Sequence, residues 1–149
     1  MKREKNILFI LTILLLLACT ACDRSARHVT ENLSQAEELI WAAPDSALHI
    51  LESISTSRHL TGKEQADYAL AQYRCYIPVS SDSLINLAIE YYKDKNDADK
   101  KGAAFYVKGC ILEEYTKDIP NALLAYKEAE MCIPDMNEKR YVARIYSSL

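Results

Sequence analysis

Cysteine, histidine and paired acidic residues are the side chains that could do chemistry in this 149-residue chain. Cys19 and Cys22 form a C-x-x-C pair, the spacing of redox sites and of half a zinc site. A zinc site needs a second ligand pair and a redox site needs a folded scaffold, and the sequence around these cysteines offers neither. His49 and Glu52 could share one helix face, but two such residues are more often solvated than metal-bound.

The acidic pairs 113–114 and 128–130 are no better as catalytic groups, because a catalytic carboxylate needs a cleft and a raised pKa. The chain contains no Gly-rich phosphate loop, no serine nucleophile elbow and no H-E-x-x-H motif. Its net charge of −3 and its lack of a basic stripe argue against nucleic-acid binding. We therefore predict a protein that is not an enzyme and that needs no metal or cofactor.

The N-terminus has the pattern of a secretory signal. Lys2, Arg3 and Lys5 precede the almost wholly apolar segment 7–17. Eleven helical residues span only about 17 Å, whereas a bilayer core is about 30 Å thick. The segment therefore predicts export rather than a membrane span.

The residues that follow, with Leu16 three residues before Cys19 and the small Ala18 directly before it, resemble a bacterial lipobox. The resemblance implies that residues 1–18 are removed and that Cys19 receives a diacylglyceryl group; Cys22 is the alternative site. Removing three basic and one acidic side chains leaves a net charge of −5, so the acyl chains would provide the membrane anchor. We expect a protein of the cell envelope, facing the periplasm or the cell exterior.

Beyond a short tether (19–28), the chain predicts an all-α domain over residues 29–149. Half of the residues are hydrophobic, only 3 Gly and 4 Pro occur, and strand-like alternation is absent. Apolar residues recur at helical spacing in seven stripes, at 29–43, 47–54, 66–76, 84–91, 103–115, 122–133 and 141–149. Helices this short are marginal alone, so neighbouring helices must bury their apolar faces.

Helix starts are indicated by three local signals. Asp45 is an expected N-cap, and Thr61 with Glu64 has the spacing of a capping box. Asp118 is an expected N-cap with Pro120 in the first helical turn, where a missing N–H costs nothing.

The helices recur in pairs, with 37 residues from Ala47 to Leu84 and 38 from Leu84 to Ala122. This spacing is near the period of about 34 residues of tetratricopeptide repeats. Residues 102–135 resemble such a repeat closely, whereas 61–94 match less well and 30–54 are degenerate. The residues that carry the resemblance, and that would pack the hairpin, are Phe105, Gly109, Ala122, Tyr126, Ala129 and Pro134.

The resemblance implies a right-handed α-solenoid of about three helix hairpins plus a seventh helix. It also implies that the first helix of each pair faces a groove that binds a protein or peptide. The residues expected to face this groove are Gln65, Tyr68, Gln72, Tyr106 and Glu113.

The whole layout is also similar to a group of Gram-negative lipoproteins, in which a lipobox leads into Asp-Arg-Ser (23–25) and later Pro-Asp-Ser-Ala-Leu (44–48), Asp-Ser-Leu-Ile (82–85) and Tyr-Tyr (91–92). Many members continue through further repeats to a transmembrane segment and sometimes a cytoplasmic helix-turn-helix. We expect the chain to be the N-terminal, interaction part of such an envelope regulator, truncated within a repeat. The alternative is a complete lipoprotein that acts as a scaffold for an envelope or outer-membrane complex.

The remaining unusual residues favour structural roles. Most of the ten tyrosines lie on apolar stripes and are expected in the core. Cys75, Cys110 and Cys132 are expected to be buried free thiols.

Overall fold

A computed structural model describes residues 27–55, 60–75 and 83–149. Within these ranges the chain is all-helical and contains no strand, as the sequence predicts. Helical structure is already present at residue 27, so residues 27 and 28 of the expected tether belong to the first helix. Cys19, Cys22 and the expected signal segment lie outside the described residues.

The described chain is a series of helices joined by short connections. A first helix at 27–39 is followed by α2, α3, α4 and α5, and α5 runs into a π-helical turn, η1. Helix α6, a 3₁₀ turn (η2) and α7 complete the described chain. Their bounds are α2 Pro44–Ser55, α3 Gly62–Arg74, α4 Ser83–Tyr92, α5 Ala98–Ile111, η1 Leu112–Thr116, α6 Ile119–Cys132, η2 Ile133–Asp135 and α7 Lys139–Ser147.

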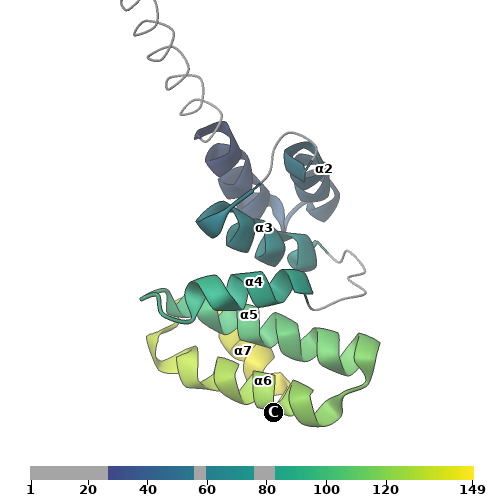
Figure 1. The fold of residues 1–149 in the computed structure, drawn as a ribbon, viewed down its shortest axis with the longest axis vertical. Helices are drawn as coiled ribbons and strands as arrows, with labels where there is room; N and C mark the ends of the chain where they lie inside the picture. The colour runs from purple at the N-terminus through teal and green to yellow at the C-terminus, as the bar shows by residue number, and fades with distance from the viewer. Residues whose placement is uncertain (1–26, 56–59, 76–82) are drawn as a thin grey trace, which may run out of the picture.

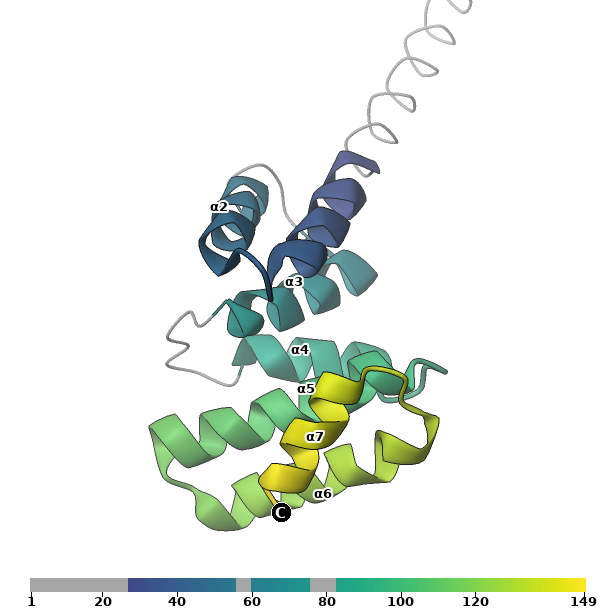
Figure 2. The same cartoon turned by 180° about the vertical axis from the view of Figure 1, so that it is seen from behind.

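The helices are stacked along the long axis of the molecule (Figure 1). Helix 27–39 and α2 lie at one end, α3 and α4 in the middle, and α5 and α6 at the other end. Seen from behind, α7 lies across α5 and α6 and contacts both (Figure 2). The contacts of α3 with α4, of α4 with α5 and of α5 with α6 make the stack continuous.

The aspartates that precede α5 and α6 cap these helices. Asp97 accepts a hydrogen bond from the backbone N–H of Lys100 (3.0 Å), and Asp118 accepts one from the N–H of Asn121 (3.3 Å). Pro120 lies in the first turn of α6, as predicted.

Two other predicted caps differ from the structure. Helix α2 already begins at Pro44, so Asp45 lies in its first turn and not before it. Proline is favoured at this position because its fixed φ suits a helix start. Thr61 does precede α3, but its side chain makes no capping hydrogen bond.

The apolar core has two main parts that meet on α3. Ala66, Ala69 and Leu70 pack with α4, α5 and α7, whereas Tyr68 and Ala71 pack with helix 27–39 and α2. The segment 66–71 is therefore buried all round. A helix in this position is held by neighbours on both sides, which explains how such short helices are stable.

The predicted apolar stripes match the buried faces except at a few residues. In α4, Ile85 and Tyr92 are buried, whereas the predicted Leu87 is exposed. Tyr115 and Leu149, the last residues of the fifth and seventh stripes, are also exposed. The buried face of α4 is rotated by about one residue from the predicted face. The sequence did not distinguish the two faces because Ile85, Ile89 and Tyr92, each next to a predicted position, are also apolar.

Small residues set the distance between α5 and α6. Gly109 of α5 lies against the ring of Tyr126, and a Cβ atom at Gly109 would collide with that ring. Ala122, Tyr126 and Ala129 are buried on the facing side of α6. Phe105 is half-buried and packs against the core, whereas Pro134 is exposed in η2.

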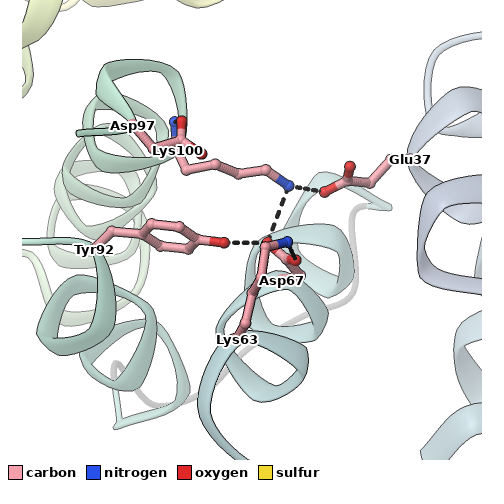
Figure 3. Close-up of polar contacts among 6 residues, drawn as sticks. All are labelled: Glu37, Lys63, Asp67, Tyr92, Asp97 and Lys100. Atoms are coloured by element: carbon pink, nitrogen blue, oxygen red, sulfur yellow. Dashed lines mark hydrogen bonds and ion pairs between the residues drawn. The ribbon is translucent and has the colours of Figure 1, made fainter. Parts of the chain in front are cut away.

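A buried carboxylate joins three helices in the middle of the stack (Figure 3). Asp67 of α3 is only 6% exposed; it accepts a hydrogen bond from the Tyr92 hydroxyl of α4 and one from Lys63 Nζ at 2.5 Å. Lys100 Nζ of α5 lies 3.1 Å from Asp67 Oδ1 and also pairs with Glu37 of helix 27–39. One ionic cluster thus connects helix 27–39, α3, α4 and α5.

The partners of Asp67 determine its charge. Burial alone would raise the pKa of Asp67 because a charged group is poorly solvated there. The hydrogen bonds from Lys63 and Tyr92 and the positive charge of Lys100 outweigh burial and hold this pKa below its ordinary value. Asp67 is therefore ionised at neutral pH.

We predict that Gly109→Ala destabilises the protein more than Gly102→Ala does. A methyl group at Gly109 meets the buried ring of Tyr126, whereas one at Gly102 meets mainly the flexible end of Met136. Such overpacking costs about 1–3 kcal/mol. Thermal unfolding of both variants measures the difference; equal melting temperatures would mean that α5 and α6 do not approach as described.

We predict that Asp67→Asn lowers the free energy of unfolding by about 2 kcal/mol at pH 7. This is less than the usual cost of breaking a buried ion pair, because the Lys63 side chain is exposed and water can solvate its charge. The lowered pKa of Asp67 stabilises the fold above the unfolded-state pKa of about 3.9, and this contribution is lost as pH falls through the folded pKa. The difference between wild type and variant should therefore shrink below about pH 4. Denaturant unfolding from pH 7 to 2.5 measures it, with the exposed Asp45→Asn as a control; a pH-independent difference would contradict the account.

Candidate functional site

A cavity of about 130 Å³ lies between helices that are far apart in the sequence. Trp41, just after the first helix, forms one wall, and α3, α5, η1 and α7 form the others. The lining residues, called here the tryptophan cavity, are Trp41, Tyr73, Arg74, Tyr106, Val107, Cys110, Glu114, Tyr115, Tyr141 and Arg144. The chain has only one tryptophan, and it lies here.

An adjoining hollow of about 370 Å³ extends this surface toward the first helix. It shares Trp41, Arg74 and Tyr141 with the tryptophan cavity. The two are therefore neighbouring parts of one groove, which we call the inner groove.

The inner groove is formed by alternate helices of the stack. Its lining residues come from helix 27–39 with Trp41, from α3, from α5 with η1, and from α7 with Glu138 before it; none comes from α2, α4 or α6. On each helix the residues recur at helical spacing and so form one face. These faces are 34, 37, 38 and 41; 70, 73 and 74; 103, 106, 107 and 110; and 138, 141 and 144.

Three guanidinium groups surround the tryptophan ring. The Cζ atoms of Arg74, Arg140 and Arg144 lie 5.5, 5.1 and 5.2 Å from the centroid of the Trp41 ring. Arg74 also lies 5.0 Å from the centroid of Tyr141. Cation–π attraction favours each placement, by about 0.5–1 kcal/mol at exposed sites and more where water is excluded.

Arg74 has one buried nitrogen atom. Its Nε atom is buried and has no hydrogen-bond partner among the described residues. An unpaired buried N–H group costs about 1–3 kcal/mol. A ligand atom that accepted a hydrogen bond from the Arg74 guanidinium would remove part of this cost.

The tyrosine hydroxyls of the cavity are neutral hydrogen-bonding groups. Burial raises the pKa of Tyr141 to about 12, although Arg74 and Arg144 act in the opposite direction. Burial and the neighbouring Cys110 raise the pKa of Tyr106 to about 12 in the same way. At physiological pH these groups can donate hydrogen bonds, so the cavity combines positive charge with aromatic walls.

The adjoining hollow has the opposite charge balance. Glu37, Glu38, Asp99 and Glu138 line it, against the cations Arg74 and Lys100. Part of this acidity is already used, because Lys100 pairs with Glu37. The Asp99 carboxylate also accepts hydrogen bonds from backbone N–H groups of residues 137 and 138.

Of the five residues predicted to face a groove, Tyr106 lines the tryptophan cavity. Tyr68 is buried against the N-terminal part of the core and accepts a hydrogen bond from Gln72 Nε2 at 2.9 Å. Gln65, also on α3, is half-buried and is not among the lining residues. Glu113 is exposed and accepts a hydrogen bond from the Tyr126 hydroxyl at 2.7 Å, which ties α6 to η1.

The sequence did not indicate that Trp41, Arg74, Tyr141 and Arg144 line a common cavity. Helix α3 is rotated relative to the expected repeat register, so positions 70, 73 and 74 face the groove in place of 65, 68 and 72. The apolar stripes of the third and fifth helices already contained Leu70, Tyr73 and Tyr106 and could have identified the face. No local pattern in the sequence indicated that Trp41 and α7 lie close together.

The cysteines of the described residues lie in the core. Cys75, Cys110 and Cys132 are buried free thiols, as predicted, and burial raises the pKa values of Cys75 and Cys132. Within the described ranges no group of three or more His, Cys, Asp or Glu side chains could hold a metal ion.

In the same part of the chain, no helix is both long and apolar enough to cross a bilayer.

Comparison of the chain with protein-family models, with curated proteins and with solved structures found no significant match.

Proposed function

We propose that this protein binds a protein or peptide partner in the inner groove while acyl chains on Cys19, or alternatively Cys22, hold it to a membrane of the cell envelope. In this proposal its helix pairs form a solenoid of tetratricopeptide type, and the protein is the interaction part of an envelope regulator. The observation that supports it best is the lining of the groove by alternate helices, which brings aromatic rings and the side chains of Arg74 and Arg144 to one cavity.

A peptide suits this groove better than a small metabolite does. The tryptophan cavity, at about 130 Å³, has room for one side chain, and the adjoining hollow of about 370 Å³ shares three of its lining residues, so the groove is divided into two connected parts and is not one enclosed pocket. The adjoining hollow extends the binding surface, as an extended chain requires. Rigid aromatic and arginine side chains are also the residue types that contribute most to protein–protein binding.

The outer face of α6 is a weaker candidate. Leu123, Leu124 and Met131 are exposed there, and an open hollow of about 510 Å³ lies between α5 and α6. This hollow is lined by Lys108, Asp118, Asn121 and Glu128 but, unlike the inner groove, contains neither tryptophan nor arginine. We therefore use this face and the outer side of α7 as controls.

A random peptide library displayed against the full chain in detergent tests the proposed binding. We expect that selected peptides bind Tyr106→Ala and Tyr115→Ala variants at least about tenfold more weakly, because both rings line the cavity. The matched control is Tyr146→Ala, which removes a 60% exposed tyrosine outside the groove. Equal binding to all variants would exclude the inner groove as the binding site.

Metabolic labelling with a radioactive fatty acid tests the proposed anchor. The wild-type chain should incorporate the label, and a Cys19→Ser, Cys22→Ser double variant should not. Cys75→Ser serves as a control that leaves both N-terminal cysteines in place. Labelling of the double variant at the wild-type level would remove the lipid anchor from the proposal.

A further inference from the structure

We propose that the tryptophan cavity is the receptor for an acidic side chain, so that the partner is a peptide segment with an Asp or Glu held by Arg74 and Arg144. This inference rests on the proposed peptide binding and specifies the chemistry of its ligand.

The first support is the geometry of Arg74. Its guanidinium lies over the rings of Trp41 and Tyr141, at 5.5 and 5.0 Å from their centroids. The two rings are inclined by 70° with centroids 6.3 Å apart, so they lie next to one another against the guanidinium, and cation–π attraction helps to hold it there. The planar edge of a guanidinium matches the two oxygens of a carboxylate. Arg74 Nε, which has no acceptor among the described residues, is a donor on that edge.

The second support is the local charge. The chain as a whole carries −3, yet Arg74 and Arg144 line the tryptophan cavity against one acidic residue, Glu114. Glu114 is exposed at the rim. A carboxylate inside the cavity would therefore meet two cations and the neutral hydroxyls of Tyr106 and Tyr141.

The third support is the charge of the neighbouring hollow, which argues against polyanionic ligands. A nucleic acid or a polyphosphate that reached Arg74 would also lie over Glu38 and Glu138. A single acidic side chain avoids this repulsion and fits a cavity of about 130 Å³. The ligand is thus an isolated carboxylate on a chain of mixed composition.

Two pools of blocked heptapeptides test this inference, with Glu or Gln at the centre, random flanking residues other than Trp and Cys, and an acetyl and an amide group at the ends. The blocked ends ensure that the central side chain is the only systematic difference in charge. Binding to the full chain in detergent is followed by the fluorescence of Trp41, the chain's only tryptophan, and by calorimetry. We expect the Glu pool to bind at least about tenfold more tightly than the Gln pool, with a preference that weakens in high salt.

Three arginine variants separate the cavity from general positive charge. Arg144→Gln and Arg74→Lys should each lose the preference for Glu; the second keeps the charge but loses the planar donor edge. Arg140→Gln is the matched control, because Arg140 lies as close to Trp41 but does not line the cavity. Thermal unfolding identifies any variant that fails to fold, and Arg144→Gln then decides the test if Arg74→Lys does not fold.

Each outcome has a distinct meaning. Loss of the preference in Arg144→Gln but not in Arg140→Gln supports the inference. Equal binding of the two pools, or equal losses in Arg140→Gln and Arg144→Gln, overturns it. If library peptides still bind in the groove without a preference for acidic residues, the proposed function stands and only the ligand chemistry is wrong. If no peptide binds, both are wrong.

Discussion

The buried charge of Asp67 is the constraint on which the arrangement of the helices depends. A carboxylate this deep in the protein is stable only if cations and hydrogen-bond donors surround it. Its donors come from three different helices, and Lys100 extends the cluster to Glu37 of a fourth element. The cluster therefore holds helix 27–39, α3 and α5 at defined positions. Together with α7, these elements line the inner groove, and Glu37 and Lys100 of the cluster are themselves among the lining residues.

Small side chains and apolar packing also fix the positions of the helices. The helices are short, and α3 is buried on both sides by the two parts of the core. Gly109 allows α6 to approach α5 closely, and α7 packs across both. Packing of α7 brings Tyr141 and Arg144 to Trp41, about a hundred residues earlier in the chain. The site is thus a product of the stacking order and not of any single helix.

Local patterns in the sequence predicted the all-helical fold and most of the buried faces. The spacing of Leu33, Ala36 and Ile40, for example, identified a face that is buried, and Asp118 marked the start of α6. Patterns of one helix could not show the rotation of α4, because Ile85 and Leu87 are both apolar and only tertiary packing distinguishes them. The ionic cluster was equally invisible, since Asp67 and Tyr92 are 25 residues apart and each looks ordinary alone. The lining of the inner groove was not predicted for the same reason: a cation lies near an aromatic ring only because of how distant segments meet.

Hydrogen–deuterium exchange on the full chain tests most directly the proposal that a partner binds to one face of alternate helices. The measurement compares the chain alone with the chain bound to a peptide selected from the library. The account predicts slower exchange in helix 27–39 and the Trp41 turn, and in α3, α5 and α7, with little change in α2 and the outer turns of α6. Protection centred on α6 without protection of α3 and α7 would contradict it, because the partner would then lie on the outer face.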